Sequence, residues 1–457
     1  MEAPSPTATS AASVVVLTAP RATPDAAAKK PFGARTRGGL LSAGSAHACA
    51  VLATGAVKCW GSGSVGPLGL GDKEGGGAPR IELDALPAVD LGTGRTAVAV
   101  AAGAMHTCAL LDTGAVKCWG EVGFGQLGLG DTKCRRDAKE MGDALPAVDL
   151  GTGRTAVAVT AGLQHTCALL NGGAIKCWGF GAFGQLGLGA MKNRGDRPNE
   201  MGDALPAVDL GTGRTAVAVS AGAFHTCAVL DTGAVKCWGH FSRLGLGDKN
   251  DRGSRPNEMG DALPAVDLGV RGRVVAVSAG AVHTCALLDG GAVKCWGEGD
   301  DGQLGLGDGK SRGSAPNEMG DALPAVDLGT GRGAVAVSAG RFHTCAVLDN
   351  GAVKCWGRGA EGQLGLGDKE RRGVGPDEMG DLLPAVDLGT GRTAVAVSAG
   401  SVHTCALLDT GAVKCWGAGL YLGLGGVNAR GDDPKETGAA PPAAAPGRGG
   451  GPSRAPS

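Results

Sequence analysis

The sequence predicts an all-β fold, a seven-bladed β-propeller of four-stranded antiparallel blades. A stretch that reads HTCALLDTGAVKCWG in its second copy recurs seven times, and the copies are 58 to 60 residues apart. Such a period indicates a supersecondary unit that stacks on its neighbours. Each period holds four short apolar segments, the pattern of a propeller blade, and seven units can close into a ring. A solenoid is the alternative arrangement.

The repeated stretch predicts a β-hairpin. In the second copy, Asp112-Thr113-Gly114 separates two apolar, β-prone segments, and other copies carry NGG, DGG or DNG in the same place. A three-residue loop ending in glycine suits a type I turn followed by a left-handed residue, a conformation that costs glycine little. Centring the loop on Thr113 places Leu110 opposite Val116 and Cys108 opposite Cys118.

The same unit shows where all four strands should lie. We expect them at 96–102, 106–111, 115–119 and 145–150, with a long glycine-rich excursion between the third and the fourth. The fourth segment, of LPAVDL type, occurs six times, and the seventh unit does not supply one. An unassigned apolar run at 13–18 is a candidate closing strand.

These observations set the expected domain limits. Residues 38–426 form the propeller, 1–37 are a disordered or targeting segment, and 427–457 are a disordered tail rich in Ala, Pro and Gly. Such a composition cannot bury enough apolar surface to fold.

Fourteen of the fifteen cysteines fall in hairpin pairs, and Cys134 is left over. Cα atoms at a non-hydrogen-bonded antiparallel site lie about 4.5 Å apart, within reach of a disulfide. We therefore expect one cross-strand disulfide per blade, although free thiols remain the alternative. The expected bridges are Cys49–Cys59, Cys108–Cys118, Cys167–Cys177, Cys227–Cys237, Cys285–Cys295, Cys345–Cys355 and Cys405–Cys415.

Cysteine pairing and the N-terminus point to different compartments. Paired cysteines favour an extracytosolic location, because disulfides persist in oxidising environments. The first residues lack the basic start of a secretory signal, which leaves a cytoplasmic location as the alternative.

Composition excludes several classes of function. A formal net charge of −1 gives no field that favours nucleic acid, and no apolar run approaches the roughly 20 residues of a membrane helix. GxGxxG runs such as Gly123–Gly128 lead into more glycine and not into a helix, which excludes a dinucleotide site. We expect a monomer without cofactor or metal. His106, Cys108 and Cys118 share a strand face, but a fourth zinc ligand is not evident.

Two repeated side chains are interpreted as structural. Each imidazole is expected to satisfy backbone groups between blades, as buried polar groups require, and each indole to fill the core between blades. The histidines are His47, His106, His165, His225, His283, His343 and His403. The tryptophans are Trp60, Trp119, Trp178, Trp238, Trp296, Trp356 and Trp416. The lysine before each Cys-Trp-Gly is interpreted as a solvated rim residue; a charged ring that attracts an acidic partner is the alternative.

The run SAGxxHTCAL, a turn, GAVKCWG and then GxxGQLGLGD resembles the repeat of the regulator of chromosome condensation family. The resemblance covers about 42–425 in seven copies, and the paired cysteines suggest a subset of that family. It implies a seven-bladed β-propeller, in agreement with the strand pattern. It also implies guanine-nucleotide exchange on a small GTPase, the activity of the founding member, which depends on an inserted β-hairpin that no unit here shows.

We therefore expect a non-enzymatic scaffold that presents loops to a protein partner. Nothing in the sequence resembles a catalytic triad or an isolated pair of carboxylates. Nucleotide exchange is the first alternative, carried by the resemblance alone. A secreted inhibitor or adhesion module is the second.

Overall fold

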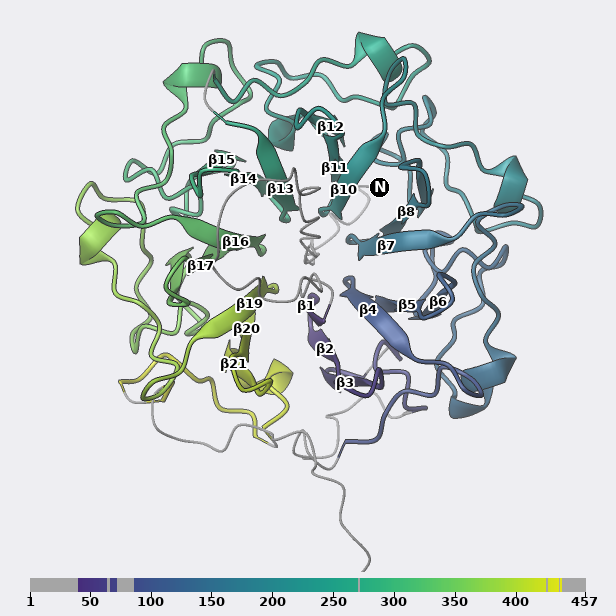
Figure 1. The fold of residues 1–457 in the computed structure, drawn as a ribbon, viewed down its shortest axis with the longest axis horizontal. Helices are drawn as coiled ribbons and strands as arrows, with labels where there is room; N and C mark the ends of the chain where they lie inside the picture. Colours follow the sequence, from purple (N-terminus) through teal and green to yellow (C-terminus); the bar gives the residue numbers. More distant parts are fainter. Residues whose placement is uncertain are drawn as a thin grey trace, which may run out of the picture.

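A computed structural model describes residues 40–63, 66–71, 86–269, 272–424, 426–434 and 436–437. These residues form seven antiparallel sheets of three consecutive strands each. Figure 1 shows the sheets as blades around a central axis, in sequence order, so the fold is a seven-bladed β-propeller. Among the described residues, no helix has the length and apolar character needed to cross a membrane.

The first strand of each blade lies nearest the axis (Figure 1). These strands are β1 (Leu41–Ala43), β4 (Ala97–Ala102), β7 (Ala156–Ala161), β10 (Ala216–Ala221), β13 (Val274–Ala279), β16 (Ala334–Ala339) and β19 (Ala394–Ala399). The middle strands are β2 (His47–Val51), β5 (His106–Leu111), β8 (His165–Leu170), β11 (His225–Leu230), β14 (His283–Leu288), β17 (His343–Leu348) and β20 (His403–Leu408). The third strands are β3 (Val57–Gly61), β6 (Val116–Gly120), β9 (Ile175–Gly179), β12 (Val235–Gly239), β15 (Val293–Gly297), β18 (Val353–Gly357) and β21 (Val413–Gly417).

The prediction of four strands per blade is wrong, because the LPAVDL segments do not form strands. The segment at 145–150 runs beside β6 but makes one backbone hydrogen bond to it, from Val148 N to Val116 O at 2.8 Å. Pro146 has no N–H to donate, so a ladder cannot continue past it. The alternation of apolar residues suggested a strand, whereas proline limits the segment to an extended flank.

The predicted hairpin register is confirmed. Leu110 pairs with Val116 and Cys108 with Cys118, and the same register recurs in every blade. Gly114, the third turn residue, has a φ of 80°, as a left-handed position requires.

The excursions between blades contain short 3-10 helices, five of which lie at a Met-Gly-Asp stretch. They are η2 (Ala138–Glu140), η3 (Gly142–Ala144), η4 (Gly202–Ala204), η5 (Phe241–Arg243), η6 (Gly260–Ala262), η7 (Gly320–Ala322), η8 (Gly380–Leu382) and η9 (Gly419–Tyr421). The apolar core lies between neighbouring blades. One cluster packs Trp178 of the third blade against Val116, Cys108 and Cys118 of the second.

The ring closes between the seventh blade and the first. Ala43 N donates to Ser398 Oγ at 2.9 Å, and Ser401 N donates to Gly44 O at 3.3 Å. The candidate closing strand at 13–18 lies outside the described residues. At the other end, Arg430 pairs with Gly417 as Arg135 pairs with Gly120, so described structure continues beyond residue 426. The domain limits themselves stay a prediction.

Candidate functional site

Each blade has two ends with different composition. At one end, His106 at the start of β5 lies opposite Gly120 at the end of β6. We call this end of all blades the His face. It comprises the two residues before each of the seven repeated histidines and the loop after each Cys-Trp-Gly. The opposite end, the turn face, comprises the hairpin turns and the Gly-Thr-Gly-Arg turns. The two kinds of turn lie side by side, because Asp112 N in the hairpin turn donates to the carbonyl of Thr96, which follows a Gly-Thr-Gly-Arg turn.

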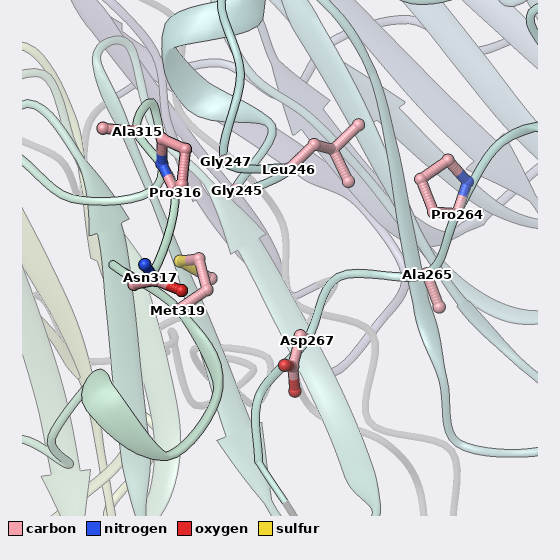
Figure 2. Close-up of a pocket in the computed structure, with 10 residues that line it drawn as sticks. All are labelled: Gly245, Leu246, Gly247, Pro264, Ala265, Asp267, Ala315, Pro316, Asn317 and Met319. Carbon is pink, nitrogen blue, oxygen red and sulfur yellow. The ribbon is translucent and has the colours of Figure 1, made fainter.

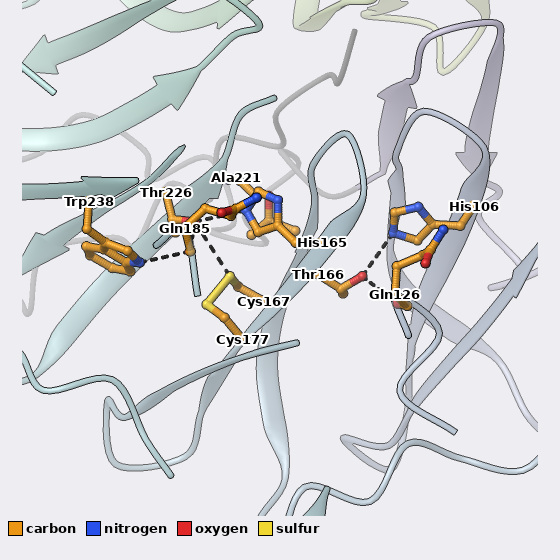
Figure 3. The surroundings of a disulfide bond; sticks show 11 residues. His106, Gln126, His165, Thr166, Cys167, Cys177, Gln185, Ala221, Thr226 and Trp238 are labelled. Atoms are coloured by element: carbon orange, nitrogen blue, oxygen red, sulfur yellow. Dashed lines mark hydrogen bonds between the residues drawn. A yellow bond between two sulfur atoms is a disulfide. The ribbon is translucent and has the colours of Figure 1, made fainter. Parts of the chain in front are cut away.

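A belt of buried hydrogen bonds joins the blades just beneath the His face. His106 Nε2 lies 2.9 Å from Thr166 Oγ1 of the next blade, and the Thr166 hydroxyl donates to the Gln126 carbonyl at 2.8 Å (Figure 3). Because the hydroxyl donates its hydrogen to that carbonyl, the threonine oxygen accepts a hydrogen bond from the imidazole N–H. His106 is therefore the neutral Nε2–H tautomer. The sequence predicted a backbone partner for this nitrogen, whereas its partner is a side-chain hydroxyl.

The same bond occurs at six of the seven blade interfaces. Burial lowers the pKa of His106 to about 4 and is the main cause that lowers the pKa of His165 to about 3, so both imidazoles are neutral near pH 7. The six Nε2–Oγ1 distances are 2.7–2.9 Å, for His47–Thr107, His106–Thr166, His165–Thr226, His225–Thr284, His283–Thr344 and His343–Thr404.

The repeated tryptophan and disulfide belong to the same interior. Trp178 is fully buried, and its Nε1 donates to the Gln126 carbonyl that also accepts from Thr166. The cysteines of every predicted pair are joined as a disulfide with a Cα–Cα distance of 4.1 Å. Cys167 Sγ lies 3.9 Å from Thr226 Oγ1, so the bridge contacts the belt (Figure 3). Cys134 is a half-buried free thiol.

The interpretation of the lysines as solvated rim residues is wrong. Lys176 is 7% exposed, and its Nζ donates to the carbonyls of Leu150 and Gly202 at 3.0 and 2.7 Å. Burial lowers the pKa of Lys176. The amine fastens the outer segment of one blade to the 3-10 helix of the next, so these lysines are not a ring that faces a partner.

The interface between the seventh blade and the first lacks some of the hydrogen bonds that join the other blades. Residue 48 is alanine where the other units carry threonine, so His403 has no hydroxyl partner in the first blade. Trp60 Nε1 has no hydrogen-bond partner within the described part of the chain. The first three residues of β21 are also more exposed than their counterparts in β6. Among the described residues, the closing interface therefore lacks the His–Thr bond and the Trp–carbonyl bond that the other interfaces have.

Above the belt, the His face is where the repeats differ. The residues directly before the histidine are Ala46, Met105, Gln164, Phe224, Val282, Phe342 and Val402. The residues directly after Cys-Trp-Gly are Ser62, Glu121, Phe180, His240, Glu298, Arg358 and Ala418. Backbone bonds such as Glu121 N to Met105 O at 2.9 Å hold the two positions together, and Met105 is 37% exposed.

Aromatic side chains gather on one sector of this face. We call the group the aromatic arc: Phe124, Phe180, Phe183, Phe224, His240 and Phe241. Ring centroids are 4.8 Å apart for Phe124 and Phe180, 5.0 Å for Phe183 and Phe224, and 5.3 Å for Phe183 and His240. All six residues are half-buried. The arc crosses the second, third and fourth blades without a break.

The sixth blade carries a different arrangement at the same positions. The guanidinium carbons of Arg341 and Arg358 lie 4.8 and 5.6 Å from the centroid of the Phe342 ring. Burial lowers the pKa of Arg341, and the charge of Arg358 adds to that shift. This sector is cationic, whereas the neighbourhood of the arc is not.

The turn face varies less from unit to unit, and in four units it carries the same ion pair. Arg95 lies 3.6 Å from Asp112, and the same pairing of a Gly-Thr-Gly-Arg arginine with a turn aspartate recurs at Arg214–Asp231, Arg332–Asp349 and Arg392–Asp409. Each pair neutralises itself locally. The turn face therefore lacks the side-chain variety that could specify one partner.

Figure 2 shows a surface cavity of about 370 Å³. Its walls come from the repeated segments Gly245–Gly247, Pro264–Asp267 and Ala315–Met319. Because similar segments recur in neighbouring units, this cavity is a feature of the repeat and carries no specific chemistry. Within the described residues, no group of three or more His, Cys, Asp or Glu could hold a metal ion.

Sequence reasoning missed the aromatic arc. It concentrated on residues that recur, and the arc consists of residues that do not. The signal was present, because five of the seven phenylalanines fall between residues 124 and 241. Aligning the units by their histidines places all five at the same ends of three consecutive blades.

Comparison with known proteins places the fold in a family. Residues 17–391 match the RCC1-like domain, and residues 394–421 match the regulator of chromosome condensation (RCC1) repeat. The ultraviolet-B receptor UVR8 of Arabidopsis thaliana is 30% identical over 393 residues, which cover 84% of this chain and 78% of the receptor. Protein pim1 of Schizosaccharomyces pombe is 28% identical over 79% of this chain and 66% of its own.

Solved structures show the same fold at lower identity. Yeast RCC1 (Prp20), solved with Kap60, is 19% identical with a TM-score of 0.63 over 91% of this chain and 90% of its own. Human WBSCR16 is 20% identical with a TM-score of 0.61 over 80% of this chain and 86% of its own. The human ubiquitin ligase HERC2 is 29% identical over 58% of this chain, which spans 5% of that ligase. This chain belongs to the regulator of chromosome condensation (RCC1) family.

Proposed function

We propose that this chain is a non-enzymatic scaffold that binds a protein partner through its His face. The observation that carries the proposal is the distribution of differences among the units. Side chains vary most where each strand pair ends at the His face, whereas the belt and the disulfides recur and the turn face varies less. Specific binding needs a surface with a distinct chemical pattern, and aromatic and arginine side chains are enriched in protein interfaces.

Site-specific photo-crosslinking tests this assignment. A photoreactive phenylalanine derivative replaces Met105 on the His face in one variant and Thr113 on the turn face of the same blade in another. Both positions are exposed, so the two variants are matched. In lysate of the producing cells, we expect a discrete adduct from position 105 that excess unmodified protein suppresses. Equal adducts from both positions, or suppressible adducts from position 113 alone, would contradict the proposal.

Guanine-nucleotide exchange on a small GTPase is the second candidate. The relatives favour this candidate, because one similar solved structure is that of yeast Prp20p, a protein that binds Gsp1p and histones. Against it, the repeat spacing of 58 to 60 residues leaves no unit with a long insertion. A fluorescent-nucleotide release assay with a Ran-type GTPase separates the two, and we expect no stimulation above background. A secreted inhibitor or adhesion module would use the same His face and differ in compartment.

A further inference from the structure

We infer that the aromatic arc, together with Glu298, Asp300 and Asp301 of the fifth blade, binds a segment of a protein partner that carries arginine or lysine side chains. This inference rests on the proposed function and names the chemistry of its ligand. The arc supplies half-exposed ring faces and edges, and the acidic group supplies carboxylates at one end of the arc. The two groups meet at Arg243.

Repeat positions show that the arc is a local feature of one sector. Phe124 and Phe183 each lie four residues after the glycine of Cys-Trp-Gly, where the fifth and sixth units carry Asp301 and Glu361. The same site therefore changes from aromatic to acidic between the third blade and the fifth. A ligand that crosses this boundary meets ring faces first and carboxylates next.

The charges described at the fourth- and fifth-blade end of the arc are mostly negative, whereas the backbone of the exposed Lys192 lies beside Gly181 in the third blade. Asp251 Oδ1 accepts from Phe241 N at 2.9 Å, and Glu298 lies 3.5 Å from Arg243 with its side chain 43% exposed. Burial raises the pKa of Glu298, Arg243 opposes that shift, and Asp300 and Asp301 add to it. Glu298 and Asp251 act on the guanidinium of Arg243, a residue that is only 8% exposed, while Asp300 and Asp301 act on Glu298. The exposed charge at this end of the arc is anionic, which suits a cationic ligand.

Arg243 shows the kind of contact that the site offers. Its guanidinium carbon lies 6.0 Å from the centroid of the Phe224 ring, its Nε donates to the Ala281 carbonyl at 2.7 Å, and one terminal nitrogen pairs with Glu298. A guanidinium is thus held between a ring and a carboxylate. Cations attract ring faces most strongly where water is partly excluded, and arginine does so more often than lysine. The remaining rings and carboxylates can accept further cationic side chains in the same way.

The test uses three fluorescent 12-residue peptides that repeat Leu-Arg-Ser, Leu-Gln-Ser or Leu-Glu-Ser, and measures their binding to the full chain by anisotropy. We expect the arginine peptide to bind at least ten-fold more tightly than the other two, and its affinity to fall as salt rises. Arginine-peptide affinity no greater than that of the glutamine peptide would overturn the inference.

Variants locate the binding. Phe183→Leu with Phe224→Leu keeps apolar bulk but removes the rings, and Glu298→Gln removes one exposed charge. We expect the arginine peptide to bind about ten-fold and about five-fold more weakly, respectively. Phe342→Leu and Glu361→Gln are the matched controls in the sixth blade and should change nothing. Unaltered affinity in Glu298→Gln and in the double variant would place the ligand elsewhere. If photo-crosslinking from position 105 succeeds while the peptides fail, the proposed function stands and this ligand assignment is wrong.

Discussion

The interior of the ring and its His face are built from the same seven units, yet they follow opposite rules. In the interior, each unit supplies the same histidine, disulfide and tryptophan, and most units also supply the threonine that accepts a hydrogen bond from the imidazole of the preceding blade. On the His face, positions one or two residues away differ in nearly every unit, from Gln164 to Phe224 to Arg358. Repetition therefore stabilises the ring, and the departures from it give each blade its own surface chemistry.

Lowering the pH should destabilise the interior, and this is the largest effect that we expect. The belt histidines have pKa values of about 3 to 4 where values are resolved, such as those of His47, His106 and His283, against about 6.5 when unfolded. Between these values the unfolded chain binds more protons, so the free energy of unfolding falls as pH falls from about 6.5 towards 4. Each histidine contributes up to about 1.4 kcal/mol per pH unit, so the seven together should lower the free energy of unfolding by about 10 kcal/mol between pH 6.5 and 5.

Urea unfolding at pH 7.5, 6.0 and 5.0 checks this expectation. Replacing one belt histidine, for instance His106→Gln, should reduce the slope of stability against pH. His240→Gln on the His face should reduce it less, because that imidazole is less deeply buried. A stability that stays constant from pH 7.5 to 5.0 would show that the belt histidines are not buried and neutral.

Removing one disulfide should have a smaller effect on the interior. Cys108→Ala with Cys118→Ala should lower the free energy of unfolding by about 1–2 kcal/mol. A ten-residue loop would give more in the chain-entropy model, but the Leu111 N to Ala115 O bond already closes the hairpin. Cys134→Ser, which breaks no bridge, is the control. Non-reducing peptide mapping of native protein provides the direct check, since alkylation of all fifteen cysteines would refute the bridges and favour a reducing compartment.

A substitution at the closing interface should increase the free energy of unfolding. Ala48→Thr places a hydroxyl where the other units have one and gives His403 a partner, so we expect a gain of about 0.5–1.5 kcal/mol. Thr166→Ala, which removes the equivalent hydroxyl at a complete interface, should cost a similar amount. Chemical unfolding measures both. A loss of stability in Ala48→Thr would mean that the seventh blade does not meet the first as the belt requires.

Features that recur were predictable from the sequence, and features that do not recur were not. The spacing of the histidines predicted seven blades, and the turn length at Thr113 predicted the cysteine register. The prediction of a fourth strand was wrong because it rested on the alternation of apolar residues alone. That alternation does not reveal that Pro146 interrupts the hydrogen-bond ladder. The prediction for the lysines was wrong because a charged side chain suggests exposure to solvent, whereas Lys176 is buried and its amine donates hydrogen bonds to two carbonyls. The arc was missed because contacts such as Phe183 with Phe224 join residues of consecutive blades that lie far apart along the chain.

The central claim is that separate residues carry stability and binding, and Gln164 and Thr166 test it most directly. They are two residues apart, but Gln164 lies on the His face and Thr166 is fully buried in the belt. The measurement pairs the free energy of unfolding with the yield of crosslinked partner from position 105. Thr166→Ala should lose about 1 kcal/mol and keep the yield, whereas Gln164→Arg should stay within about 0.5 kcal/mol and lose it. An unchanged yield in Gln164→Arg together with a lost yield in Thr166→Ala would contradict the account.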